Sequence, residues 1–256
     1  MSKLFVSKRT RAAAWVILLV LPALMAAFGY YHSHRPAVNP VGSRTFWDYI
    51  ILNSDILLGL LFLLASAIPF ILVFDKKKPQ ARELVPIAVM AAIAVVGRTV
   101  FEIIPLPNFK PCSAIIIITA VAFGPEAGFL TGALTAFVSN FIFGQGPWTP
   151  WQMFAMGLCG FLAGVLYRRG LLRRGRVSLC IFGALSALLV YGVLMNVSSA
   201  LLWQGTVSWA TIGAYLLSGF PVDCVHAAAT VFFLWIAAEP MLEKLDRIKE
   251  KYGLLL

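Results

Sequence analysis

The chain has 256 residues, of which 60% are hydrophobic and 12% are charged, and its mean hydropathy of +0.86 excludes an ordinary soluble domain. Its apolar runs are continuous rather than alternating, so an all-α polytopic membrane protein is predicted. The formal net charge of +10 could suggest nucleic-acid binding. The basic residues, however, cluster between apolar runs, as cytoplasmic loops do.

Eight apolar runs predict eight spans. The first is interpreted as an anchor rather than a cleaved signal peptide, because it is longer than a usual signal core. A two-span extension, residues 1–80, thus precedes a six-span domain, residues 81–256, and the last span begins near Ser218 with Pro221 in its first turn. Outer loops are predicted at 32–52 and 204–219, and a charged cytoplasmic helix at 239–256. The predicted spans are 12–31, 55–74, 84–104, 112–123, 126–143, 151–167, 177–203 and 218–238.

The run at 112–123 has only twelve residues, roughly 18 Å of helix against a bilayer core of about 30 Å. A re-entrant segment is therefore the alternative to a crossing. If the run crosses, all four basic clusters fall on one side of the membrane, which the positive-inside rule favours. Both termini are then cytoplasmic. The clusters lie at 1–11, 75–82, 168–176 and 244–251.

The rest of the chain is organised around a hairpin at 124–166. Small residues four apart on both helices, such as Gly128 with Gly132 and Gly160 with Gly164, predict close backbone packing. The turn between them is rich in glycine and proline. We expect this hairpin to form the wall of a ligand cavity open to the outside, lined by Asn140, Gln145, Trp148, Trp151 and Gln152. The two tryptophans suit an interfacial aromatic belt or stacking on a flat organic ring.

Ionisable residues in lipid are costly unless they are paired or hydrated. Arg98 and Glu102 are four apart on the third span, which suits either a structural pair or two groups lining a cavity. Asp223 and His226 share a face of the last span, as a proton relay, a ligand contact or a hydrogen-bonded pair. The proline-bounded outer loop adds three further candidates for ligand binding, namely Asn108, Phe109 and Lys110.

Ala88 and Ala92 place two small side chains on one face of the third span, and Ala91 and Ala94 are expected to extend that smooth surface. Internal packing and docking on a partner helix are both consistent with this pattern. The four cysteines have no CxxC spacing and are interpreted as packing residues. The sequence contains no phosphate loop, HExxH or GxSxG motif, and no catalytic residue, metal site or cofactor is predicted.

Residues 83–256 resemble the substrate-binding S components of energy-coupling factor (ECF) vitamin transporters. The likeness is carried by ELVPIAVMAAIAVVGR, PNFKPCSAIIIITAVAFGPEAGFLTGALTAFVSNF, FGQGPWTPWQMFAMGLCGFLAGVL and FPVDCVHAAATVFFLWIAAEPMLEKLDRIKEKYG. It implies a six-helix subunit of the bacterial cytoplasmic membrane that binds a vitamin near the outer face. It also implies docking on a membrane coupling protein driven by two cytoplasmic ATPases, with toppling of the whole subunit in the bilayer.

In that family an AxxxA pattern on the first core helix faces the coupling protein, and Ala88 and Ala92 match it. The turn GQGPWTPWQM most resembles the cobalamin group, which implies cobalamin or a related corrinoid as the ligand. Riboflavin, queuosine precursors and other flat heterocycles are alternatives. Two other functions stay open: a proton-coupled secondary transporter, and a membrane enzyme with Asp223 and His226 as acid–base groups.

Overall fold

The structure is a computed structural model that describes residues 8–34, 36, 38–74, 81–204 and 208–253, and these residues form helices and connecting loops without a β-strand. Two stretches, η1 and η3, are π-helical and one, η2, is a 3₁₀-helix. The elements are α1 (Lys8–Trp15), η1 (Val16–Val20), α2 (Leu21–His34), α3 (Phe46–Leu52), α4 (Ser54–Phe74), α5 (Ala81–Val100), η2 (Phe101–Ile103), α6 (Cys112–Phe123), α7 (Pro125–Phe143), α8 (Thr149–Arg168), α9 (Arg176–Leu185), η3 (Ser186–Gly192), α10 (Val193–Trp203) and α11 (Trp209–Tyr252).

The short helix α6 is the centre of the bundle. All twelve of its residues are buried, and it packs against α5, α7, α8 and α11. A helix enclosed by protein makes no contact with lipid, so the bilayer thickness does not set its length. This explains why an apolar run too short for an ordinary span lies between longer ones.

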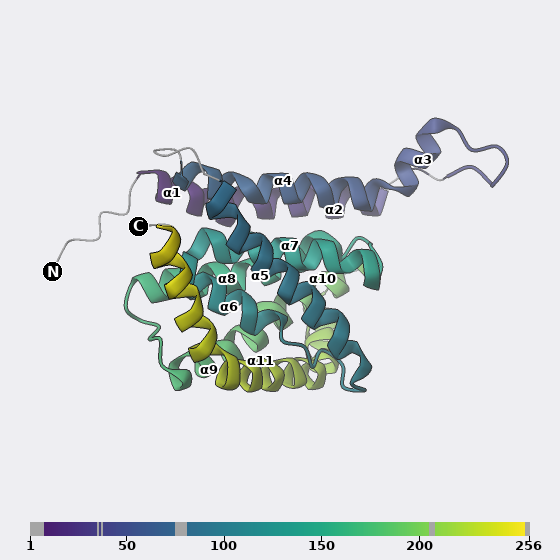
Figure 1. The fold of residues 1–256 in the computed structure, drawn as a ribbon. Coiled ribbons are helices and arrows are strands. Elements are labelled where there is room, and N and C mark those ends of the chain that lie inside the picture. The colour runs from purple at the N-terminus through teal and green to yellow at the C-terminus, as the bar shows by residue number, and fades with distance from the viewer. Residues whose placement is uncertain (1–7, 35, 37, 75–80, 205–207, 254–256) are drawn as a thin grey trace.

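The N-terminal extension forms a layer along one side of the bundle. The helix made of α1, η1 and α2 lies beside α4, and α4 packs on α7 and α8. The extension and α11 lie on opposite sides of the bundle (Figure 1).

The α7–α8 hairpin packs through glycine, as predicted. A Cβ built on Gly160 would lie 2.5 Å from the carbonyl oxygen of Gly128, and one on Gly132 would lie 2.6 Å from the backbone nitrogen of Gly157. Such contacts are possible only without side chains, because the two backbones touch. Gly157 was not among the residues predicted to make this contact.

Replacing Gly160 with Val is expected to force α7 and α8 apart, because the new side chain meets backbone that cannot rotate away. Overpacking of this kind costs about 1–3 kcal/mol, which a shift of the thermal unfolding midpoint in detergent will report. Gly213→Val is the matched control, since nothing lies within 4 Å of a Cβ on that helical glycine. Equal midpoints for the two variants would contradict the close packing.

The bundle has two distinct ends. We call the end that holds the start of α1 and the end of α11 the termini end (Figure 1). Basic residues gather there: Arg168 pairs with Glu126 at 3.2 Å, and Lys249 donates to the carbonyl oxygen of Ala122 at 2.8 Å. The opposite end, which holds the η2–α6 loop (residues 104–111) and the α7–α8 turn (residues 144–148), is the turn end. Of the predicted basic clusters, Lys3 and Lys76, Lys77 and Lys78 lie outside the described residues.

Several helices could cross a membrane. Among the described residues, five are long and apolar enough, and the pair Phe46–Leu52 and Ser54–Ile68, bent by 61°, would be a sixth. Ala12–Ala27 and Cys112–Phe123 are shorter apolar helices. The eight predicted spans all correspond to helices, while their number and the side on which the termini lie remain predictions. The five are Leu84–Ile103, Pro125–Phe143, Thr149–Arg168, Arg176–Trp203 and Trp209–Tyr252.

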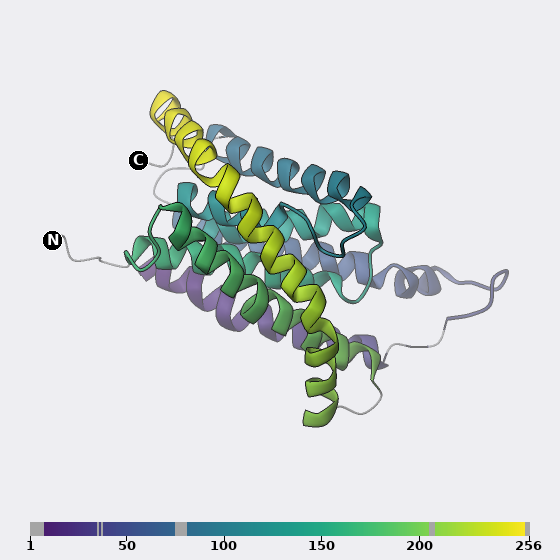
Figure 2. The same cartoon turned by 90° about the horizontal axis from the view of Figure 1, so that it is seen from below.

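The last helix differs from the prediction. α11 begins at Trp209 rather than near Ser218, and it continues through Pro221 and Pro240 over 44 residues. Proline removes one helical hydrogen bond but does not end a helix that neighbouring helices support, and α11 is bent along its length (Figure 2). The predicted charged tail is the continuation of this helix, and its leucines Leu242 and Leu245 are buried in the bundle.

Three smaller predictions also need correction. Ala91 and Ala94 are buried on the inner face of α5 and do not extend the smooth outer surface. Cys224 is exposed, whereas the other three cysteines are buried as packing residues should be. The outer loop at 32–52 contains the helix α3, which begins with a capping box.

Candidate ligand-binding site

Arg98 is a buried cation in the last turn of α5 at the turn end. Its guanidinium donates to the hydroxyl of Ser139 and, at 3.0 Å, to Oδ1 of Asn140, both on α7. It also lies 4.8 Å from the ring centroid of Phe143. The charge is therefore solvated by neutral groups, and the alternative of a structural pair between Arg98 and Glu102 is wrong.

Glu102 pairs instead with Lys110, which closes the η2–α6 loop. The Lys110 ammonium lies 4.5 Å from the ring centroid of Phe143, so this loop and the end of α7 meet. Asn108 adopts a left-handed backbone with φ 59°, which asparagine tolerates in tight loops. Phe109 packs on the α11 ring of Phe233 at 5.6 Å between centroids. All three loop candidates thus stand at the turn end.

The α7–α8 turn is organised by Thr149. Its hydroxyl donates to Oε1 of Gln145 at 2.9 Å and accepts, at 3.2 Å each, from Nδ2 of Asn140 and the backbone N–H of Gly146. Nε2 of Gln145 donates in turn to the carbonyl oxygen of Phe137 at 2.9 Å. The turn and Arg98 therefore belong to one hydrogen-bonded network, joined through Asn140.

Trp148 covers this turn from the side. A Cβ on Gly146 would meet its ring, and its ring centroid lies 6.3 Å from that of Trp203 at the end of α10. The indole is half-buried, so it is held by the turn and by α10. The stacking role predicted for it is not tested by this geometry.

A second polar chain crosses the interior from α8 to α6. Nε2 of Gln152 donates to the Tyr191 hydroxyl at 3.1 Å, and the Tyr191 ring stands edge-on to the His226 ring at 4.6 Å. Nε2 of His226 is 2.8 Å from the hydroxyl of Ser113. The two hydrogen-bonded chains start from the same first turn of α8, at Thr149 and Gln152. We therefore group them as one polar cluster, defined as Arg98, Ser113, Ser139, Asn140, Gln145, Thr149, Gln152, Tyr191 and His226.

Two buried atoms of this polar cluster have no hydrogen-bond partner among the residues that the structure describes: Oε1 of Gln152 and Nδ1 of His226. The indole Nε1 of the neighbouring Trp151 has none either. Unpaired buried polar atoms are rare and destabilising, and each needs an explanation. Oε1 of Gln152 can accept, Nε1 of Trp151 can donate, and Nδ1 of His226 can do either, depending on its tautomer. Such a set of unpaired groups suits a polar ligand.

Asp223 and His226 do not form the predicted alternative of a hydrogen-bonded pair. Oδ2 of Asp223 accepts from Nδ2 of Asn196 at 2.7 Å, while His226 faces Ser113. Gly192 makes room for the carboxylate, because a Cβ there would lie 2.5 Å from it. Asn196 thus makes a hydrogen bond between α10 and α11.

Four members of the polar cluster were missed in the sequence. Tyr191 lies in an otherwise apolar span, and a hydroxylated aromatic residue there was a usable signal. It sits in the π-helix η3, and such segments are frequent at functional sites. Ser113, Ser139 and Thr149 carry no comparable pattern, because hydroxyls in membrane helices commonly bond their own backbone.

Three cavities among the described residues lie outside the polar cluster. One of about 270 Å³ lies between α2, α4 and Pro150, one of about 370 Å³ between α5, α6 and α11, and one of about 550 Å³ at the termini end. None of these three is lined by Arg98, Asn140 or His226. The predicted wide cavity open at the turn end is not among them, and the polar side chains contact one another instead.

Comparisons with known proteins agree with the membrane architecture. A profile of the family described as ECF-type riboflavin transporter, S component, matches residues 78–241. A UPF0397 protein of Vibrio atlanticus (strain LGP32) is 26% identical over 126 residues, which cover 47% of this chain and 69% of that protein. UPF0397 proteins of Aliivibrio fischeri strains MJ11 and ATCC 700601 / ES114 are 30% identical over 89 residues, 34% of this chain. The match spans about half the length of these two proteins, 48%. No solved structure matches the chain.

Proposed function

Because the chain belongs to the family of ECF-type riboflavin transporter S components, we propose that it captures a flat nitrogen heterocycle in the polar cluster. It then delivers this ligand by docking on a membrane coupling protein driven by two ATPases. S components are multi-pass membrane proteins and transporter subunits rather than enzymes, which sets aside the membrane-enzyme hypothesis.

The observation that carries this proposal is the pair of unpartnered atoms in the polar cluster, Oε1 of Gln152 and Nδ1 of His226, together with the buried cation Arg98 of the same cluster. Flat heterocycles such as flavins present ring nitrogens, carbonyl oxygens and N–H groups along one edge. An acceptor, an imidazole and a guanidinium complement that edge. The ligand thus takes the hydrogen bonds that the protein leaves unmade.

The compactness of the polar cluster supports a ligand of flavin size in place of the corrinoid suggested by the turn sequence. Gln152 and Tyr191 meet directly at 3.1 Å, and His226 and Ser113 at 2.8 Å. A corrinoid is wide, so its binding would require both of these contacts and those around them to separate. A single flat ring system could insert between the side chains with a smaller separation. The family description names riboflavin, which makes riboflavin the first compound to test.

The orientation of the subunit follows from charge. The described basic residues on α8, α9 and α11 gather at the termini end, where Arg174 pairs with Asp246 and Arg176 with Glu239. Positively charged loops stay in the cytoplasm. The turn end, with the polar cluster, then faces outward, where the ligand is captured.

A titration of the purified protein with riboflavin, followed by quenching of flavin fluorescence, tests the site. Gln152→Leu removes an unpartnered acceptor and is expected to raise the Kd about tenfold, the equivalent of about 1.4 kcal/mol. Gln204→Leu is the matched control, because Gln204 makes the same bond to a tyrosine hydroxyl, Tyr215 at 2.9 Å, but is exposed.

Three results would contradict this proposal. Equal Kd values for the two glutamine variants would remove Gln152 from the site. Tight binding of cobalamin with no binding of riboflavin would restore the corrinoid. Uptake by the lone protein in vesicles, driven by a pH gradient, would support the proton-coupled alternative.

A further inference from the structure

The N-terminal extension touches the hairpin at the residues that support the α7–α8 turn. Helix α4 packs on α7 and α8, and Gly59 faces both of them. A Cβ on Gly59 would lie 3.3 Å from the ring of Phe137 and 3.6 Å from Cγ2 of Thr149. A side chain no larger than a methyl group therefore fits between the α4 backbone and these two side chains.

Phe137 and Thr149 are the two residues that hold Gln145 in place. The carbonyl oxygen of Phe137 accepts from Nε2 of Gln145, and the hydroxyl of Thr149 donates to its Oε1, both at 2.9 Å. Thr149 also accepts from Asn140, which in turn accepts from Arg98. Two hydrogen bonds, from Asn140 to Thr149 and from Arg98 to Asn140, therefore connect the α4 contact at Gly59 with Arg98.

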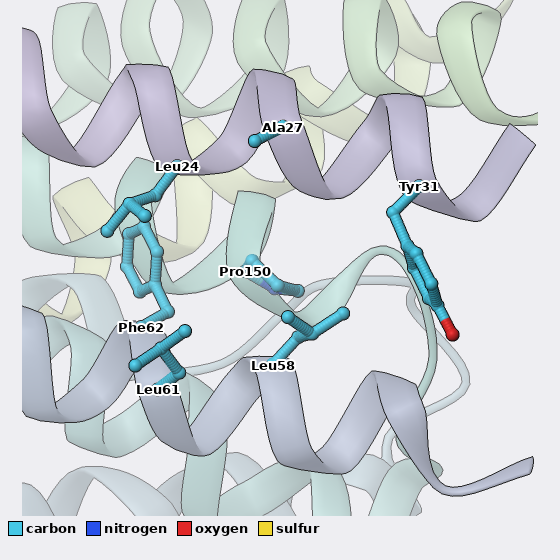
Figure 3. A pocket seen from close by; sticks show the side chains of 7 residues that line it. All are labelled: Leu24, Ala27, Tyr31, Leu58, Leu61, Phe62 and Pro150. Carbon is cyan, nitrogen blue, oxygen red and sulfur yellow. The ribbon is translucent and has the colours of Figure 1, made fainter. Parts of the chain in front are cut away.

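The space around this contact is loosely filled. An apolar cavity of about 270 Å³ lies between α2 and α4, with Pro150 at one side. Figure 3 shows Leu58 and Phe62 of α4 and Leu24 of α2 around it, with the ring of Tyr31 further along α2. Next to this cavity the extension and the α7–α8 turn are not tightly packed. The contact at Gly59 is therefore expected to contribute more than its surroundings to the effect of α4 on the turn.

We propose that α4 is a positioning element of the ligand site: packed at Gly59 beside Phe137 and Thr149, it confines these two side chains and so holds the α7–α8 turn and Asn140 in the geometry that binds ligand. This gives the two-helix extension a role in binding, and its functional part rests on the proposed function of the polar cluster.

The test uses the full chain with Gly59→Leu, which drives α4 away from Thr149. Hydrogen–deuterium exchange at the Gly146 amide, whose N–H donates to Thr149, is expected to rise at least about fivefold, and the Kd for riboflavin about tenfold. Gly59→Ala is expected to stay near wild type, because the ring of Phe137 needs to move only a few tenths of an ångström. Leu64→Trp adds bulk on the outer face of α4, where Leu64 is exposed, and is expected to change neither quantity.

Phe62→Ala is the second variant, for the case in which Gly59→Leu does not fold. It enlarges the cavity without adding an atom, and it is also expected to raise both the exchange at the Gly146 amide and the Kd for riboflavin. Unchanged exchange at Gly146 in folded Gly59→Leu and Phe62→Ala proteins would overturn the proposal. Raised exchange with an unchanged riboflavin Kd would overturn its functional part. If the wild-type protein binds no riboflavin while exchange rises as expected, the support of the turn stands and the proposed function fails.

Discussion

An Arg98→Gln variant is expected to lose riboflavin binding, with the Kd raised at least about a hundredfold, or about 2.7 kcal/mol. Arg98 is the buried cation of the polar cluster, and it orders Ser139 and Asn140 by direct hydrogen bonds. Hydrogen bonds to charged groups contribute about 1.5–3 kcal/mol each. Loss of the charge therefore removes the proposed ligand contact and the support of Asn140 together.

Two further variants make this result interpretable. Arg98→Lys keeps the charge but loses the planar fork, so an intermediate affinity is expected. Arg44→Gln changes a half-buried arginine of the α2–α3 loop and controls for the loss of one positive charge. Thermal unfolding of all three in detergent shows whether the fold survives. Wild-type affinity in a folded Arg98→Gln protein would exclude Arg98 from the site.

Replacing both Ala88 and Ala92 with Phe is expected to abolish uptake in cells while leaving the riboflavin Kd within about twofold. Both alanines are exposed on the outer face of α5, beside the exposed side chains of Val85 and Val89. This face is smooth because its side chains are small or β-branched, and small residues allow another helix to approach closely. Two phenylalanines would hold the coupling protein away without touching the polar cluster.

The matched control is the double replacement of Ala210 and Ala214 with Phe. These alanines have the same spacing and are also exposed, but they lie on the first turns of α11. We expect this variant to retain uptake. Loss of ligand binding in the Ala88 and Ala92 variant, rather than of uptake alone, would assign these alanines to internal packing instead of docking.

The sequence predicted those features that depend on residue spacing along a helix or on a polar residue within an apolar span. Glycines four residues apart predicted the tight α7–α8 hairpin, because backbone contact in lipid has few other sequence signatures. The family resemblance implied that Ala88 and Ala92 face a partner protein, and both are exposed, while their docking role stays a prediction. Arg98, Gln152 and His226 were singled out simply because polar groups in apolar spans need partners.

The sequence could not identify which partners those groups have. Arg98 was weighed as a pair with Glu102 from i,i+4 spacing, but the two belong to different networks because Lys110 and Asn140 come close only in the fold. Tyr191 reaches Gln152 from 39 residues away, through a π-helical turn that no sequence pattern indicated. Proline was likewise read as a boundary at Pro221, where tertiary packing instead continues α11.

The most direct test is to identify the small molecules released when the purified protein is denatured, using mass spectrometry on wild type and Arg98→Gln in parallel. The account predicts a flat nitrogen heterocycle, near one per chain, from the wild-type protein and none from the variant. Equal amounts of the same compound from both proteins, or a compound without a planar hydrogen-bonding ring, would contradict it.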